Sequence, residues 1–259
     1  LEDNLMRLFG SDRIAKVMDR MGIKEGEVIT HSMVTKSIER AQKKVEAMNF
    51  SGRKNIIEYD DVMNYQREVV YSRRNFSLHE EDISVELNQI IEEHIDDVLD
   101  DYCVGSNVDN WDIESLQTEI LNTYSLDFKF EASMNKKAEL KSMLIEGSSK
   151  ILDFKKENFD ENILNQFQRF IVLRTIDKEW QDHLYMMDQL REGIGLRAYG
   201  QKNPLVEYKH EGFAMFESMM KSTNTQTLKR IFRTDISSLA QGAMHHTQRA
   251  KNIQTKKDQ

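Results

Sequence analysis

Proline is nearly absent from this chain: there is one in 259 residues, against roughly 5% in average proteins. Glycine is also sparse, with 11 residues. Because these two residues begin most turns and interrupt most helices, their scarcity predicts long helices with few breaks. All-β folds need a turn about every 8–12 residues and are therefore excluded. We expect an all-α fold.

Cysteine and long apolar runs are scarce as well. The one cysteine, Cys103, cannot form a disulfide within the chain or a cysteine metal cluster. No apolar stretch reaches the ~18 residues of a membrane-spanning helix, and no signal-peptide pattern opens the chain. These features favour a soluble chain in a reducing compartment.

Motifs for nucleotide, metal and nucleic-acid chemistry are missing too. No Gly-x-x-x-x-Gly-Lys-Ser/Thr loop is present, so no nucleotide site is predicted. Glu207 and His210 match one Glu-x-x-His pair of a di-iron bundle, but a second pair is absent and no metal is expected. The net charge of −8 argues against nucleic acid as a partner. We therefore expect no catalysis, cofactor or metal on this chain.

Apolar residues spaced by three and four positions predict one very long helix over residues 32–73, about 63 Å at 1.5 Å per residue. The alternative is two helices broken near residues 49–52, where Gly52 stands in the stripe. The stripe consists of Ile38, Ala41, Val45, Met48, Ile56, Tyr59, Met63 and Val70.

An acidic helical segment follows, because residues 80–119 contain fourteen Asp or Glu and no Lys or Arg. A break is predicted at residues 105–110, with another helix starting near Trp111. Shorter helical pieces are expected after Asp127, with a loop near residues 147–149.

A helical hairpin is predicted next. Residues 160–192 carry an apolar stripe, and the three glycines of residues 193–203 end it. Asn203 and Pro204 then form an N-cap followed by proline at the first helical position. From Asn224 onward a further helix is expected. The stripe of residues 160–192 consists of Ile163, Phe167, Phe170, Leu173, Ile176, Trp180, Leu184, Met187 and Leu190.

Several of these segments carry sequences that are similar to one family. Residues 58–67 (EYDDVMNYQR) and 71–75 (YSRRN) closely resemble the long scaffold helix of the SecA family, the motor ATPases of bacterial preprotein export, and residues 34–46 are similar to the start of that helix. Residues 177–180 (DKEW) and 193–202 (GIGLRAYGQK) resemble the two-helix finger of the same family.

The resemblance implies a fragment of a longer protein, with a long scaffold helix, a helical wing and a two-helix finger rather than a compact bundle. Both nucleotide-binding domains, the preprotein cross-linking domain and the cysteine-rich zinc tail of the family would be absent, so ATP and Mg would bind elsewhere in the parent. The implied parts are 1–10, the tail of the second nucleotide-binding domain; 11–75, helical scaffold; 76–158, helical wing; 159–222, two-helix finger; and 223–259, C-terminal scaffold helix and linker.

The resemblance also implies a role for the fingertip. Tyr199 would contact the moving polypeptide in the SecY channel, with Gln201 beside it. Arg197 and Lys202 would face channel loops or lipid head groups. An exposed aromatic ring suits this role because it presses on any chain without needing a particular sequence.

On the helices, Asp60, Asp61 and Arg67 would couple the long helix to the motor domains. The alternative is ordinary ion pairing on a helix surface, which is worth about 0.3–0.5 kcal/mol per pair. Trp180 and His183 lie one turn apart and are expected to pack in the hairpin core.

The function implied by the resemblance is a regulatory and force-transmitting part of a preprotein translocase, without catalysis of its own. Its partners would be the motor domains, the SecY channel complex, preprotein and an anionic membrane surface, in the cytoplasm at the inner membrane. Apolar surface left by the missing domains would allow a homodimer. Two alternatives stay open: a free-standing helical adaptor or dimerisation scaffold, and a carboxylate-bridged metal enzyme.

Overall fold

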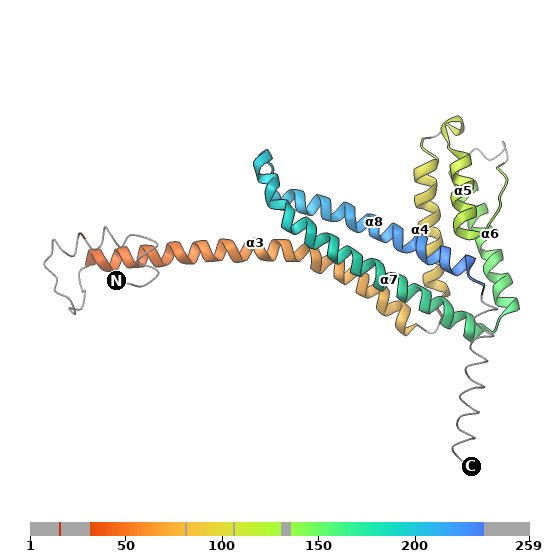
Figure 1. Ribbon diagram of the computed structural model, residues 1–259, viewed down its shortest axis with the longest axis horizontal. Helices are drawn as coiled ribbons and strands as arrows, with labels where there is room; N and C mark the ends of the chain where they lie inside the picture. The colour runs from red at the N-terminus through yellow and green to blue at the C-terminus, as the bar shows by residue number, and fades with distance from the viewer. Residues whose placement is uncertain (1–15, 17–31, 81, 106, 131–135, 236–259) are drawn as a thin grey trace, which may run out of the picture. The chain divides into compact units, whose positions relative to one another are not determined.

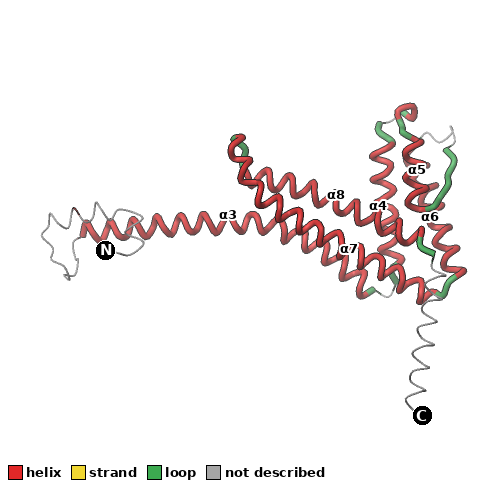
Figure 2. The backbone as a smooth tube through the Cα atoms, in the orientation of Figure 1, coloured by secondary structure: helices red, strands yellow, loops and turns green. Residues whose placement is uncertain are grey.

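A computed structural model describes residues 16, 32–80, 82–105, 107–130 and 136–235, except for the side chains of Ser32, Met33, Val34, Ser37, Ala198 and Tyr199. In these residues every regular element is a helix, joined by short loops (Figure 2). The all-α prediction is therefore confirmed. The chain divides into two compact units, Leu1–Asn64 and Tyr65–Gln259.

The first described helix, α3, runs from Ser32 to His79 without interruption. Its 48 residues extend over about 72 Å. Gly52 lies within it, and a Cβ added there would meet nothing within 4 Å. An exposed glycine costs a helix about 1 kcal/mol but need not break it. The single long helix is thus confirmed, and the alternative of two helices broken near residues 49–52 is wrong.

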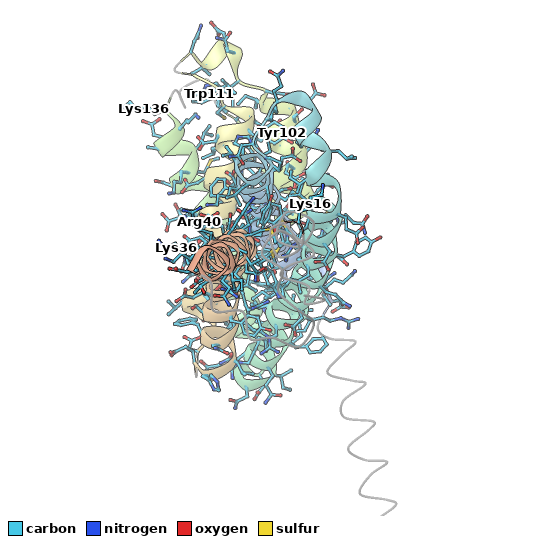
Figure 3. All side chains as sticks on the ribbon, turned by 90° about the vertical axis from the view of Figure 1, so that its left-hand side faces the viewer. Lys16, Lys36, Arg40, Tyr102, Trp111 and Lys136 are labelled. Carbon is cyan, nitrogen blue, oxygen red and sulfur yellow. The ribbon has the colours of Figure 1, made fainter. Side chains whose placement is uncertain are left out.

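The four elements that follow α3 form the wing: α4 (Ser84–Tyr102), η1 (Val108–Asn110), α5 (Ile113–Tyr124) and α6 (Lys137–Asn158). Trp111 lies in the loop between η1 and α5, and its indole Nε1 donates to the Gly105 carbonyl over 3.3 Å. The amide of Asp112 donates to the carbonyl of Tyr102, and Tyr102 and Trp111 lie toward the same end of the wing (Figure 3).

The loop predicted near residues 147–149 is not formed, because α6 continues through it. The hydroxyls of Ser148 and Ser149 donate to carbonyls four residues earlier in the same helix, over 2.7 and 2.9 Å. Gly147 contributes close packing: a Cβ there would lie 2.7 Å from a methyl carbon of Leu126. This Gly-Ser-Ser sequence therefore marks a close contact and not a break.

The hairpin comprises α7 (Glu161–Gly193), the 3-10 helix η2 (Ile194–Gly200) and α8 (Pro204–Arg233). The two long helices run side by side and are joined at one end (Figure 1). The Asp160 side chain accepts from the amides of Asn162 and Ile163, and the Asn203 side chain accepts from the amide of Leu205. The predicted cap at Asn203 and the helix over residues 160–192 are confirmed.

The buried face of α7 differs from the predicted stripe in the first half of the helix. Ile163 and Phe170 are exposed, whereas their neighbours Leu164 and Ile171 are buried. The reason is that two polar residues lie on the buried face, so the spacing of apolar residues alone does not identify that face. These buried polar residues are Gln168 and Thr175.

The separate helix expected from Asn224 onward is also wrong for the described residues, because α8 continues to Arg233. Its second half packs on α4 and α5, so one helix belongs to both the hairpin and the wing (Figure 1). Lys155 of α6 defines the end of α8: its Nζ donates to the carbonyls of Ile231 and Phe232 over 2.6 and 2.9 Å. An ammonium group at a helix C-terminus also complements the helix dipole.

Replacing Lys155 with methionine is expected to lower the free energy of unfolding by about 2 kcal/mol. The variant keeps the apolar stem but leaves two carbonyls at the end of α8 without their charged donor. Urea unfolding followed by circular dichroism measures the loss. Lys150→Met is the matched control, because Lys150 lies on the same helix in an exposed pair with Glu146. Equal effects from the two variants would contradict the capping role.

Candidate functional site

The hairpin tip holds two of the predicted contact residues in ion pairs. Arg197 Nη2 lies 3.0 Å from Glu211 Oε1, and Lys202 Nζ lies 3.1 Å from Glu207 Oε2. Both basic side chains are exposed, while both glutamates are half-buried. Sequence spacing did not predict these pairs, because their members lie in different elements: Arg197 lies in η2, Lys202 lies in the loop after it, and both glutamates lie in α8. The formal charges at these four positions of the tip therefore sum to zero.

The tip also presents an apolar side chain that the sequence analysis missed. Leu196 is among the most exposed large apolar residues of the hairpin. Its exposure could have been predicted from its position between Gly195 and Arg197, because a single apolar residue in a glycine-rich tip has few neighbours to pack on. Gln201 is exposed and adopts a left-handed backbone, with φ of 58°. The side chain of Tyr199 lies outside the described residues.

A polar bridge connects α3 to both helices of the hairpin. The His183 ring nitrogen Nε2 and the Gln66 side-chain oxygen Oε1 lie 2.9 Å apart. The Gln66 nitrogen Nε2 donates to the Gly212 carbonyl over 3.0 Å. Gln66 is 3% exposed and His183 is fully buried. Because an amide oxygen only accepts hydrogen bonds, His183 Nε2 carries the proton and donates.

Aromatic rings enclose His183. Its ring lies 5.6 Å from that of Trp180 and 5.7 Å from that of Phe216. Trp180 is buried as well. Burial lowers the pKa of His183 below its ordinary value, because charging the ring in this surrounding costs desolvation energy. His183 is therefore a neutral donor at pH 7.

The predicted coupling residues lie on α3. Asp60 is half-buried and Asp61 is exposed, both in the first unit, whereas Arg67 is exposed in the second. Arg67 directly follows Gln66, which the sequence analysis did not single out. Gln66 could have been identified from the sequence as a polar residue within the apolar stripe of α3.

A second polar network lies near the end of α3. Arg73 Nε lies 2.5 Å from Glu86 Oε1 of α4, and Arg73 Nη2 lies 3.4 Å from Glu93 Oε2. Asn224 of α8 donates to the same Glu93 oxygen over 2.9 Å. The side chains of Arg73 and Glu86 are only 11% and 6% exposed. Arg73 and Glu86 therefore form a largely buried ion pair between α3 and α4, and Glu93 beside it connects α8 to the same network.

Between the hairpin helices lies a groove of about 420 Å³. The groove is lined by Glu179, Met186, Ala214, Met215, Ser218, Met219 and Ser222. The methionines in this lining can accommodate apolar side chains of varied shape, because methionine is flexible and polarisable.

The described residues contain no group of three or more side chains suited to hold a metal ion. In the same residues no helix is long and apolar enough to cross a membrane.

Comparison with known proteins assigns these elements to a family. The family model described as "SecA Wing and Scaffold domain" matches residues 28–235. The chain is 43% identical over 236 residues to the protein translocase subunit SecA of Prosthecochloris aestuarii, covering 90% of this chain and 22% of that protein. It is 45% identical to that of Chlorobium phaeovibrioides, again over 236 residues with 90% and 22% covered.

A third relative, the protein translocase subunit SecA of Endomicrobium trichonymphae, is 41% identical over 240 residues, which cover 91% of this chain and 28% of that protein. The chain thus spans between about a fifth and a third of the length of these relatives. The scaffold helix, the wing and the matched residues 28–235 together show that the chain belongs to the SecA family.

Proposed function

We propose that this chain is a regulatory and force-transmitting part of a preprotein translocase. It couples ATP hydrolysis in separate motor domains to movement of a polypeptide through the SecY channel. One observation carries the proposal: a single helix, α3, continues from Ser32 to His79 and is hydrogen-bonded through Gln66 to both hairpin helices. An unbroken helix transmits a displacement along its axis, because its backbone hydrogen bonds resist stretching.

The two ends of this path have different proposed partners. Asp60, Asp61 and Arg67 contact the motor domains, and the tip around Tyr199 contacts the moving polypeptide. Leu196 adds exposed apolar area at the tip, which suits contact with a chain of any sequence. The pairs Arg197–Glu211 and Lys202–Glu207 support the shape of the tip.

The proposed location is the cytoplasmic face of the inner membrane, by peripheral association. The SecY channel complex and preprotein are the proposed protein partners there. Because Arg197 and Lys202 are already paired with glutamates, we expect them to add little to binding of an anionic membrane surface, and that binding to weaken further as salt rises.

ATP hydrolysis tests the regulatory part of the proposal. The chain alone is expected to show no turnover. A motor half from a SecA relative, containing the nucleotide-binding domains, is expected to lose activity saturably as this chain is added. Turnover by this chain alone would contradict the proposal. A motor half indifferent to the chain would favour the adaptor alternative.

Tyr199→Ala is expected to reduce polypeptide movement in a reconstituted translocase by about 2- to 10-fold, the range of a single aromatic contact. Suppression of ATP hydrolysis should be unchanged, because the tip is distant in sequence from the proposed motor contacts. Translocation of a labelled preprotein into vesicles provides the measurement. Tyr185→Ala is the control, since Tyr185 is an exposed tyrosine on the same hairpin. Equal losses in both variants would argue against a special role of the tip.

The second candidate function is a helical adaptor or homodimer, and it is favoured by exposed apolar side chains on α3. Burying such side chains against a partner is favourable at roughly 25 cal/mol per Å². Sedimentation equilibrium over a range of concentrations distinguishes the two candidates, since an adaptor dimer persists without motor domains. The exposed residues are Met48, Phe50, Ile56 and Ile57.

A further inference from the structure

The bridge made by Gln66 lies near the start of the second unit, which begins at Tyr65. Its side chain is almost completely buried, and it uses both ends of its amide: the oxygen faces α7 and the nitrogen faces α8. Other helices accept hydrogen bonds from Gln66, Arg73 and Arg74 on this part of α3. Gln66 connects to both helices of the hairpin.

The neighbours of Gln66 on the same helix face are all apolar. One turn before it stand Val62 and Met63, and one turn after it stand Val69 and Val70. If α3 slid by one turn, an apolar side chain would face the His183 N–H and the Gly212 carbonyl. Both groups would then be buried without partners, which is expensive. A single polar residue in an apolar stripe is a known means of fixing one register between helices.

We propose that Gln66 is a positioning residue that holds α3 against both helices of the hairpin in a single register. Its two hydrogen bonds, to His183 and to the Gly212 carbonyl, together form the clasp. The contact is either made or lost, because a partial displacement breaks both hydrogen bonds without providing new ones. Arg73, seven residues further along and paired with α4, holds the other end of the segment. Loss of the clasp therefore removes the contact of α3 with both hairpin helices at Gln66, while Arg74 still pairs with Asp177 of α7 and Arg73 with α4. The clasp stands on the geometry alone, while its use in force transmission rests on the proposed function.

Distance measurements between two spin labels test the clasp on the full chain. Cysteines replace the exposed residues Tyr65 on α3 and Tyr185 on α7 in a Cys103→Ala background. One narrow distance distribution is expected with Gln66 present. Gln66→Leu should increase the population at longer distance at least tenfold, which corresponds to about 1.4 kcal/mol. The helix content measured by circular dichroism should be unchanged.

A matched control separates this role from general loss of a buried polar group. Thr223 is buried and its hydroxyl donates to Met219 within α8. Thr223→Val should leave the distance distribution narrow. The inference is overturned if Gln66→Leu also leaves it narrow, or if Thr223→Val broadens it equally.

The wild-type chain offers a second test that needs no variant at position 66. Nitrogen-15 chemical shifts of the His183 ring report which nitrogen carries the proton, and Nε2–H is expected as the single form at pH 7. In Gln66→Leu the two neutral forms should become mixed. A wild-type ring protonated at Nδ1 would overturn the clasp even if Gln66→Leu failed to fold. Neither measurement involves a motor half, so failure of the clasp is distinguishable from failure of the proposed regulation.

Discussion

Replacing Arg73 with leucine is expected to lower the free energy of unfolding by about 3–5 kcal/mol, the usual cost of removing one partner of a buried ion pair. The leucine would leave the Glu86 carboxylate buried without its guanidinium partner, and Glu93 would lose a second contact. The loss should be measured by urea unfolding at pH 7.

The adjacent residue provides the control for this prediction. Arg74 forms an ion pair with Asp177 over 2.7 Å, but the side chains are 33% and 53% exposed. Arg74→Leu should cost at most about 1 kcal/mol, because water screens an exposed pair. The double variant Arg73→Leu/Glu86→Leu should recover at least half of the loss by removing the orphaned charge. A single variant at Arg73 that costs no more than Arg74→Leu would show that the pair is not effectively buried.

Acid is expected to destabilise the wing through His94. Its ring shares a 3.0 Å hydrogen bond with the Tyr124 hydroxyl in a buried site, and burial lowers the pKa of His94 to about 4 from 6.5. The folded state therefore binds fewer protons than the unfolded state below pH 6.5. Stability is unaffected by His94 above that pH and is lost as the pH falls towards 4. The loss is about 1.4 kcal/mol at pH 5.5 and approaches about 3 kcal/mol near pH 4.

The pH dependence of urea unfolding between pH 7 and 4.5 measures this effect. His183 contributes in the same direction, because burial also lowers its pKa. His94→Gln should remove the His94 contribution and flatten the curve, although it lowers stability at pH 7. His79→Gln is the control, since His79 is exposed at the end of α3. An unchanged slope in His94→Gln would contradict the assignment.

Helix positions were largely predictable because this chain has few residues that interrupt helices. The long helix α3 and the cap at Asn203 followed from local sequence alone. The loop wrongly predicted near residues 147–149 shows where local sequence fails. Gly147 and the serines after it are turn formers by propensity, but tertiary contact with Leu126 favours a continuous helix there.

The interactions at the candidate site were less predictable, because they depend on side chains far apart in sequence. Trp180 and His183 could be assigned to the hairpin core from their spacing, and both are buried. Their connection to Gln66 bridges 117 residues, and no local pattern encodes such a distance. The partners of Arg73 are only 13 and 20 residues away, but they lie on the next helix, and periodicity within one helix does not pair residues on two helices. Buried polar residues also misled the assignment of the α7 face, since hydrophobic periodicity treats Gln168 and Thr175 as surface positions.

The continuity of α8 limits how this molecule can be divided and recombined. Its first half forms one arm of the hairpin, and its second half packs on the wing up to Arg233, where Lys155 caps it. A chimera that exchanged the hairpin at residue 222 would join two sequences inside a packed helix. Chimeras between relatives should therefore exchange all of α8 together with the helices on which it packs, which are α7, α4 and α5. The hairpin and the wing would then be inherited, and would diversify, as one linked piece.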